Sequence, residues 1–415
     1  MSDLNVINQD VPTTGDPQAS SCCGGSSCED QGQLNVDQAV RDRYADAAQE
    51  KEQALCCPVD YDAQYLKIIP EEIIERDYGC GDPSKYVKPG ETVLDLGSGG
   101  GKICYITSQV VGEAGRVIGV DCNDVMLDLA RKYQPEMAQK MGYSNVEFHK
   151  GKIQDLKLDL DAFEKHLKEN PVTTSAGWMQ AQEVADQLRS EQPLIPDNTV
   201  DVVVSNCVLN LVGKQDRRQL FSEIFRVLKR GGRAVISDIT CDETVPDELQ
   251  NDPTLWSGCI SGAFREDEFL SVFEEAGFYG CTILARQSEP WVVVEGIEFR
   301  SLTIEAYKGK EGPCLDRKQA VVYNGPWKAV IDDDGHKLVR GKRMAVCDKT
   351  FQIYSQNPYQ KDITSIAPFE NIELENAAEY NCHAGSIRSA RETKQGKTDL
   401  NNTASESCCG TDGCC

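Results

Sequence analysis

Long apolar runs, clustered basic residues and histidine are all scarce in this chain of 415 residues. No stretch approaches the roughly 18 consecutive apolar residues of a membrane-spanning helix, and the opening "MSDLNVINQD" lacks the basic start and apolar run of a signal peptide. The formal net charge of −24 argues against a nucleic-acid partner, because phosphate backbones need clustered lysine and arginine. We therefore expect a cytoplasmic monomer that acts on a small molecule, with no membrane or nucleic-acid partner.

Cysteine, by contrast, is abundant, with 19 residues spread along the chain. In a large chain expected in the cytoplasm, most of these residues should be thiols rather than disulfides. Several lie in two Gly- and Ser-rich stretches, "SSCCGGSSC" at 20–28 and "SCCGTDGCC" at 407–415. We expect residues 1–36 and most of residues 371–415 to form disordered, cysteine-rich tails.

Between the two tails, short apolar strands alternate with helical stretches from residue 91 onward. The strands are "TVLDLGSG", "VIGVD", "VEFHKG", "DVVVSNC" and "RAVISDI". This alternation predicts an α/β fold with a parallel sheet and crossover helices in a domain over residues 37–280. A polar stretch at 156–196 is interpreted as a helical insertion before the fourth strand. Beyond it, β-branched and aromatic runs with turn signals predict a smaller, mostly β domain over residues 281–370.

The first strand leads directly into a glycine-rich loop, "DLGSGGGK", which opens a helix. Alone, such a loop also fits an ordinary strand-to-helix turn. The second strand, however, ends in Asp121, about 20 residues further on, where a carboxylate can bind ribose hydroxyls. Together these features predict a nucleoside cofactor, either a dinucleotide or S-adenosylmethionine, and the acidic residue before closely spaced glycines favours S-adenosylmethionine. The expected cofactor-binding residues are Asp95, Gly97, Ser98, Gly99, Gly101, Asp121, Ile153, Gln154 and Asn206.

The fourth strand ends in "SNCVLN" at 205–210, which places Cys207 where a methyl donor would face its acceptor. Methyltransferases that act on oxygen or nitrogen usually need a base to take the acceptor's proton, and histidine is the common choice. Of the four histidines, only His149 falls within the α/β alternation, where a structural role is more common than a catalytic one. This shortage indicates an acceptor that needs no deprotonation, such as a thiolate-bound soft element with a lone pair.

Several motifs resemble those of arsenite methyltransferases, in the same order and surroundings. They are "RDYGCG" at 76–81, "LDLGSGGGK", "GVD", "SNCVLNLV" at 205–212, "RVLKRGG" at 226–232, "LWSGCISGA" at 255–263 and "CCG" near the carboxyl end. The resemblance implies a Rossmann-like class I methyltransferase sheet and an enzyme that detoxifies arsenite, free or as a thiol complex, with methyl groups from S-adenosylmethionine. It also implies that the thiolates of Cys80, Cys207 and Cys259 hold trivalent arsenic.

The resemblance further implies a fourth catalytic cysteine, upstream of Cys80, which forms a disulfide when pentavalent methylated arsenic is reduced to the trivalent state. Cys56 and Cys57, in "ALCCPVD", occupy that region; adjacent thiols cannot be separated from sequence, and we favour Cys57. A thiol reductant, glutathione or thioredoxin, is the expected electron source, which makes thioredoxin a candidate partner.

The remaining central cysteines match no motif of the family, and we assign them to packing or surface. They are Cys104, Cys122, Cys241, Cys281, Cys314, Cys347 and Cys382. Two other classes of protein stay open at this stage. One is a thiol-rich metalloid-binding protein without catalytic activity, and the other is a methyltransferase for an organic small molecule in which the cysteines are incidental.

Overall fold

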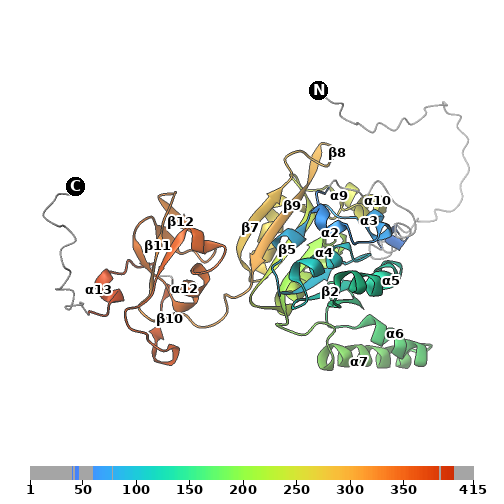
Figure 1. Ribbon diagram of the computed structural model, residues 1–415, viewed down its shortest axis with the longest axis horizontal. Helices are drawn as coiled ribbons and strands as arrows, with labels where there is room; N and C mark the ends of the chain where they lie inside the picture. The colour runs from blue at the N-terminus through green and yellow to red at the C-terminus, as the bar shows by residue number, and fades with distance from the viewer. Residues whose placement is uncertain (1–39, 41–42, 46–58, 77, 383–384, 397–415) are drawn as a thin grey trace, which may run out of the picture. The chain divides into compact units, whose positions relative to one another are not determined.

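The computed structural model describes residues 40, 43–45, 59–76, 78–382 and 385–396 (Figure 1). Cys56, Cys57 and the two cysteine-rich terminal stretches lie outside these described residues. Within the described ranges, no helix combines the length and the apolar character needed to cross a bilayer.

A nine-stranded sheet forms the centre of the larger domain, in the order β3-β2-β1-β4-β5-β9-β7, with β6 added to β5 and β8 added to β9. The five strands that the sequence alternation predicted are present and pair in parallel. They are β1 (Thr92–Leu96), β2 (Arg116–Asp121), β3 (Val146–Lys150), β4 (Val200–Asn206) and β5 (Leu228–Cys241). The α/β fold with a Rossmann-like parallel sheet is therefore confirmed.

The sheet continues past residue 280, where the sequence analysis placed a domain boundary. β6 (Phe264–Arg265) lies before that boundary, β7 (Tyr279–Arg286) crosses it, and β8 (Val292–Val294) and β9 (Ile297–Tyr307) lie beyond it. β9 pairs antiparallel with β5, from Arg233 opposite Tyr307 to Cys241 opposite Phe299. β-Branched and aromatic residues are enriched in strands of any sheet, so the amino-acid pattern could not distinguish strands added to the first sheet from strands of a new domain. The smaller domain therefore begins after β9.

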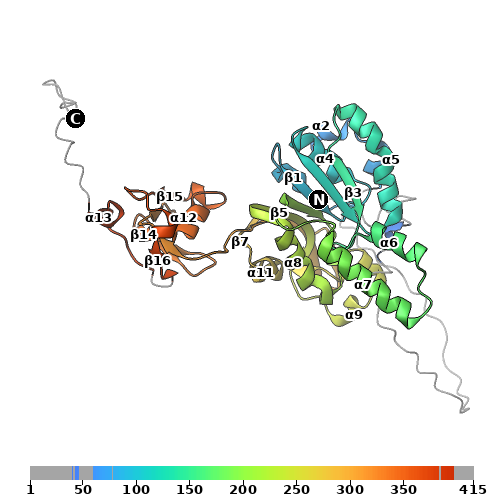
Figure 2. The same cartoon turned by 90° about the horizontal axis from the view of Figure 1, so that it is seen from below.

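Helices cover both faces of the sheet (Figures 1 and 2). One face carries α2 (Ala63–Leu66), α3 (Glu71–Glu75), α4 (Lys102–Val111) and α5 (Asp124–Met141), and the other carries α8 (Arg217–Val227) and α11 (Glu266–Glu275). Successive strand residues point to opposite layers, so that Val93 packs in the cluster with α4 and α5, while Leu94 packs in the cluster with α8 and α11. Because both faces are buried, the strands read as continuous apolar runs.

The stretch at 156–196 forms two helices, α6 (Leu160–Glu169) and α7 (Ser175–Glu191), as the sequence predicted. Each begins at a capping side chain: Asp159 accepts a hydrogen bond from the N–H of Ala162, and Thr174 accepts one from the N–H of Gly177. Figure 1 shows the two helices side by side. Lys150, at the end of β3, binds Glu164 on α6 at 2.9 Å and thereby ties the insertion to the carboxyl ends of the strands.

The smaller domain consists of short antiparallel sheets around a core that includes Val321, Tyr323 and Tyr354. Its elements are β10 (Leu315–Asp316), β11 (Ala320–Tyr323), β12 (Ala329–Ile331), β13 (Lys337–Val339), β14 (Arg343–Ala345), α12 (Asp348–Tyr354), β15 (Ile363–Ile366), β16 (Ala378–Glu379) and α13 (Ala390–Thr393). They are drawn in orange to red in Figure 1.

This domain extends to residue 396, beyond the boundary expected at 370. β16 pairs with β10, and the buried guanidinium of Arg388 forms two 2.7 Å hydrogen bonds with the carboxylate of Asp316. Residues 371–382 and 385–396 are therefore part of the folded domain rather than of a tail. Sequence composition missed them because a buried ion pair and backbone pairing, rather than an apolar pattern, fix this segment.

Candidate active site

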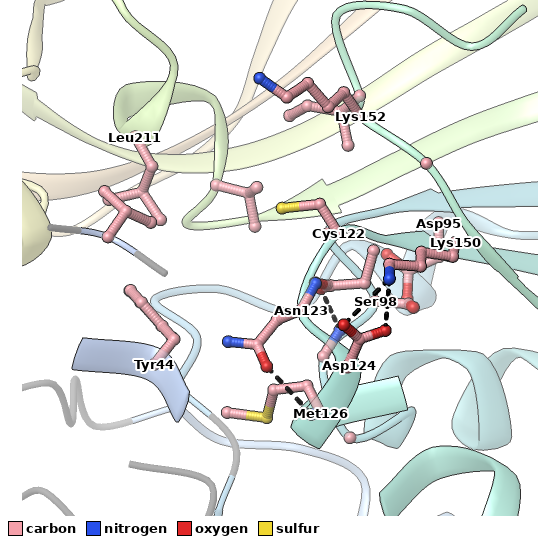
Figure 3. A pocket seen from close by; sticks show the side chains of 18 of the residues that line it. Tyr44, Asp95, Ser98, Cys122, Asn123, Asp124, Met126, Lys150, Lys152 and Leu211 are labelled. Atoms are coloured by element: carbon pink, nitrogen blue, oxygen red, sulfur yellow. Dashed lines mark hydrogen bonds and ion pairs between the residues drawn. The ribbon is translucent and has the colours of Figure 1, made fainter. Parts of the chain in front are cut away.

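A cavity of about 490 Å³ opens where β1, β2, β3 and β4 end, the edge at which parallel α/β sheets bind ligands (Figure 3). Eight of the predicted cofactor residues line it: Asp95, Gly97, Ser98, Gly99, Asp121, Ile153, Gln154 and Asn206. Gly101 does not. It is the N-cap of α4, with a left-handed φ of 88°, and a Cβ there would lie 2.8 Å from the ring of Phe148. Gly101 therefore shapes the loop rather than the cavity wall.

The loop between β1 and α4 has the backbone geometry of a binding loop for a polar ligand. Gly97 has a φ of 69°, and a Cβ added to it would lie 2.4 Å from Val208. At Gly99, with a φ of 49°, a Cβ would meet nothing within 4 Å, so the backbone borders open space. The hydroxyl of Ser98 is buried and has no hydrogen-bond partner in the described part of the chain. An unsatisfied buried hydroxyl is costly, and a polar group of a nucleoside cofactor would satisfy it.

The side chain of Asp121 is held by the backbone at the edge of the cavity. One carboxylate oxygen accepts a hydrogen bond from the N–H of Gly99 at 2.9 Å, and the other accepts one from the N–H of Asn123 at 2.8 Å. Burial raises the pKa of this carboxyl, although both bonds oppose the shift. Each oxygen keeps further acceptor capacity, so the arrangement suits binding to a pair of ribose hydroxyls.

The sequence analysis missed one wall of the cavity, which the insertion supplies. The lining side chains of α6 are Leu160, Phe163, Glu164 and Leu167. One face of α6 carries apolar residues at i, i+3 and i+7, namely Leu160, Phe163 and Leu167. This spacing could have indicated a buried surface. Figure 3 shows Lys150 directed at Asp124, with Tyr44 and Leu211 on the side away from Asp95 and Ser98.

Three separate segments bring the predicted cysteines together. Cys80 precedes the short helix η2 (Pro83–Tyr86), Cys207 follows β4, and Cys259 follows α10 (Pro253–Ser257). All three are at least nine-tenths buried in one apolar cluster, and Cys207 also lines the cavity. Cys80 and Cys207 form a disulfide with their Cα atoms 5.8 Å apart, and the Sγ of Cys259 lies 3.5 Å from the carbonyl oxygen of Cys207. The three sulfur-bearing residues therefore meet beside the cavity.

Two of these cysteines adopt a backbone conformation that L-residues rarely tolerate. The φ angle is 61° at Cys207 and 62° at Cys259, both in the left-handed region. This conformation costs a residue with a Cβ roughly 1–2 kcal/mol, and such strain concentrates at functional sites. Glycine would adopt it without strain, so the presence of cysteine makes both positions candidates for a functional role.

Asn206 fixes the Cys80 loop to the end of β4. Its amide oxygen accepts hydrogen bonds from the N–H groups of Cys80 at 2.9 Å and Gly81 at 3.1 Å. Its amide nitrogen donates to the carbonyl of Gly81 at 2.7 Å and to the hydroxyl of Tyr61 at 3.1 Å. These four bonds use the hydrogen-bonding capacity of the amide, so Asn206 borders the cavity as a residue that positions Cys80.

Asp238, on β5, fixes the loop that carries Cys207. Its carboxylate accepts hydrogen bonds from the N–H of Leu209 at 2.9 Å and the side-chain amide of Asn210 at 2.7 Å. It also lies within 4.8 Å of the sulfurs of Cys80 and Cys207. Burial raises the pKa of this carboxyl to about 7, opposed by backbone hydrogen bonds and by Arg217. The sequence analysis missed Asp238 because its hydrogen-bond partners, Leu209 and Asn210, lie in the loop after β4 rather than near it in sequence.

Comparisons with known proteins agree with this geometry. Residues 87–177 and 179–277 match a methyltransferase domain, and residues 310–398 match a domain of unknown function. The arsenite methyltransferase of Aquipseudomonas alcaligenes is 29% identical over 333 residues, which cover 76% of this chain and 85% of that protein. The human arsenite methyltransferase is 30% identical over 310 residues, which cover 72% of each.

A solved structure supports the same relationship. It is the crystal structure of CrArsM, an arsenic(III) S-adenosylmethionine methyltransferase from Chlamydomonas reinhardtii. The match has a TM-score of 0.51 and 26% identity, and it covers 78% of this chain and 100% of that one. Sequence, fold and cavity together lead to one assignment: the chain belongs to the arsenite methyltransferase family and is an S-adenosylmethionine-dependent enzyme.

Proposed function

We propose that this enzyme transfers methyl groups from S-adenosylmethionine to trivalent arsenic held by the thiolates of Cys80, Cys207 and Cys259. The observation that carries the proposal is the convergence of three cysteines from distant segments, two of them in left-handed conformations, beside the cavity of the glycine loop. Soft thiolates select soft metalloid centres, and three of them satisfy trivalent arsenic while leaving its lone pair exposed.

The chain's own residues orient the two reactants. Asp121 accepts hydrogen bonds from the ribose, Ser98 and the backbone around Gly97 and Gly99 bind the polar end of the cofactor, and Ile153 and Gln154 border the adenine. Asp95 holds the start of the loop through a 3.2 Å contact with the thiol of Cys104. Bound S-adenosylmethionine supplies an electrophilic sulfonium methyl group. Fixing it in line with the arsenic lone pair removes most of the entropic barrier to transfer.

The transfer needs no base. The arsenic lone pair forms the new bond to carbon, the electrons of the carbon–sulfonium bond return to sulfur, and arsenic rises from the trivalent to the pentavalent state. Among the described residues no histidine lines the cavity, which agrees with an acceptor that carries no proton to remove.

A second methyl transfer requires two electrons to regenerate the arsenic lone pair. Two cysteine thiols supply them by forming a disulfide, for which Cys57 and Cys80 are the proposed pair, with Cys57 outside the described residues. The bond between Cys80 and Cys207 supports a cycle in which these sulfurs exchange partners. While that bond is present the three-thiolate site cannot form, so a thiol reductant, glutathione or thioredoxin, must act first. The proposed setting is a cytoplasmic monomer.

A speciation assay on single cysteine variants tests the proposal. Cys207→Ser and Cys259→Ser should abolish methylation of both arsenite and monomethylarsonous acid, because a serine hydroxyl is a hard, protonated ligand. Cys80→Ser and Cys57→Ser should lose turnover on arsenite yet keep one methyl transfer to monomethylarsonous acid, since two thiolates suffice once a methyl has replaced one sulfur.

The matched control is Cys241→Ser, because Cys241 is a buried thiol in the same apolar cluster but carries no proposed role. It should methylate both substrates like the wild type. A Cys207→Ser or Cys259→Ser protein that melts normally and still methylates either substrate at a wild-type rate would exclude the three-thiolate mechanism. Methyl transfer to an organic acceptor without arsenite would exclude arsenic as the substrate.

A further inference from the structure

A second group of three cysteines lies in the smaller domain, where the sequence analysis assigned each of them to packing or surface. Cys314 precedes β10, Cys347 is the N-cap of α12, and Cys382 follows β16. Their sulfur atoms all lie within 4.8 Å of one another. All three remain thiols in the structure. Three residues that are far apart in sequence thus meet as tightly as a set of ligands around one ion.

The backbone holds these cysteines together without a disulfide. β10 pairs with β16, and the N–H of Tyr380 donates to the carbonyl of Cys314 at 2.9 Å, which fixes the Cys314 and Cys382 segments against each other. The hydroxyl of Tyr380 donates to the carbonyl of Ala345 at 2.8 Å, and the side chain of Gln319 donates to the carbonyl of Val346 at 2.6 Å. The second pair of bonds fixes the segment that leads to Cys347.

The arrangement has a closed side and an open side. Cys347 is fully buried, and its sulfur accepts a hydrogen bond from the N–H of Thr350 at 3.4 Å. Cys314 and Cys382 are half-buried, so a solute can reach the group past them. Burial and the two neighbouring thiols hold the pKa of Cys382 well above its usual range. A thiol loses its proton when it becomes a ligand of a thiophilic ion.

Two carboxylates that lie close to the cysteines in sequence are already paired. Asp316 binds Arg388, and Asp348 binds Arg317 at 3.0 Å. Among the residues that the structure describes, the group contains no histidine or carboxylate as a fourth ligand. A structural zinc site takes four ligands in a tetrahedron, whereas trivalent arsenic is satisfied by three sulfurs. The three sulfurs that the structure describes therefore suffice for trivalent arsenic, whereas zinc would need one ligand more, and His383, next to Cys382 in sequence, lies outside the described residues.

We propose that Cys314, Cys347 and Cys382 form a second trivalent-arsenic site, separate from the methylation site. Arsenous acid binds there by exchange of its three hydroxyls for three thiolates, with release of three waters and no change in oxidation state. All residues that line the cofactor cavity lie at or before Val212, so none belongs to the smaller domain. Arsenic at the second site is held and not methylated. The choice of arsenic as the ligand rests on the proposed function, whereas the presence of a site formed by three cysteines is independent of it.

The test counts arsenic atoms bound to the full-length chain. In the background protein, serine replaces the cysteines outside the described residues: Cys22, Cys23, Cys28, Cys56, Cys57, Cys408, Cys409, Cys414 and Cys415. The reduced protein is dialysed to equilibrium against arsenite, and arsenic is measured per chain. We expect about two atoms in the background, one fewer after Cys347→Ser, one fewer after Cys207→Ser, and none when both substitutions are combined.

The two single substitutions separate the two proposals. Unchanged arsenic binding in both Cys347→Ser and Cys382→Ser proteins overturns the second site, while unchanged binding in Cys207→Ser overturns the catalytic one. Cys281→Ser is the matched control, since Cys281 is a half-buried thiol outside both groups, and it should retain two atoms. A different metal would also overturn the proposal. That result would be one zinc ion bound per chain, which arsenite does not displace and which the Cys347→Ser protein does not bind. Methylation at saturating arsenite should be unchanged when Cys347→Ser is the only substitution in the chain, because no residue of the smaller domain lines the cofactor cavity.

Discussion

Replacing Asn206 with alanine removes the side chain that fastens the Cys80 loop to β4. The N–H groups of Cys80 and Gly81 lose the acceptor that they now contact at 2.9 and 3.1 Å. A buried donor left without a partner costs about 1–3 kcal/mol. Both N–H groups are at least partly buried in the wild type, and loss of a side chain that borders the cavity opens them toward it, so we take the lower end of that range for each. The sum is about 2 kcal/mol.

This free energy should affect the melting temperature and arsenite binding together. For a domain of this size, ~2 kcal/mol lowers the melting temperature by about 4–8 °C. If the reduced Cys80 loop must be reordered when arsenic binds, the same free energy weakens arsenite affinity by about thirtyfold. Under the proposed function monomethylarsonous acid is held by Cys207 and Cys259 alone, so it should bind with nearly wild-type affinity. Fluorescence of Trp256, which is buried three residues before Cys259, reports both titrations.

Asn145 provides a matched control at the opposite, amino-terminal end of the strands. Its side chain donates to the carbonyl of Gly112 at 2.8 Å and accepts from the hydroxyl of Ser108 at 2.6 Å. Asn145→Ala should lower the melting temperature without changing arsenite affinity. The reasoning is refuted if Asn206→Ala binds arsenite as tightly as the wild type, or if it weakens S-adenosylmethionine as strongly as arsenite. The second result would make Asn206 a direct cofactor ligand.

Three other predictions concern the cofactor wall and the smaller domain. Asp121→Ala removes charge-assisted hydrogen bonds worth about 1.5–3 kcal/mol, so calorimetry should show roughly ten- to hundredfold weaker binding of S-adenosylmethionine and unchanged binding of arsenite. Unchanged affinity for S-adenosylmethionine would mean that Asp121 has only a structural role. Phe163→Ala removes half-buried apolar contact worth about 1 kcal/mol and should weaken the cofactor about fivefold, whereas the exposed Trp178→Ala should not. The hydrogen bond to Asp332 raises the pKa of His336 above its ordinary value of about 6.5. Protonated His336 therefore stabilises the folded state fully below about pH 6.5, and this stabilisation is lost as the pH rises through the pKa of the folded state. Proton NMR titration should show that pKa fall in Asp332→Asn, and an unchanged value would contradict the assignment.

The sequence predicted the parts of the fold that depend on local pattern. Apolar runs identified the five parallel strands, and the glycines with Asp121 located the cofactor edge because both lie where strands end. The thiols at Cys80, Cys207 and Cys259 were found through family motifs. Composition alone would have left each of them as an ordinary buried cysteine.

What escaped the sequence depends on contacts between distant segments. β9 and β7 could be assigned to the first sheet only once the pairing of β9 with β5, and of β7 with β9, was known. The role of Asn206 follows from hydrogen bonds to a loop far back in the sequence, and that of Arg388 from an ion pair with Asp316. The group around Cys347 likewise has no local signature, because each cysteine stands alone in its own segment. The wall formed by α6 was the exception, since its apolar spacing was visible.

The left-handed backbone at Cys207 and Cys259 has a consequence for how such a sequence can drift. Glycine is the residue that adopts this conformation at both positions without strain. Each replacement by glycine would relieve backbone strain at the expense of a buried sulfur and its packing. Under the proposed function, a Cys207→Gly or Cys259→Gly protein should therefore remain folded and fail to methylate arsenite.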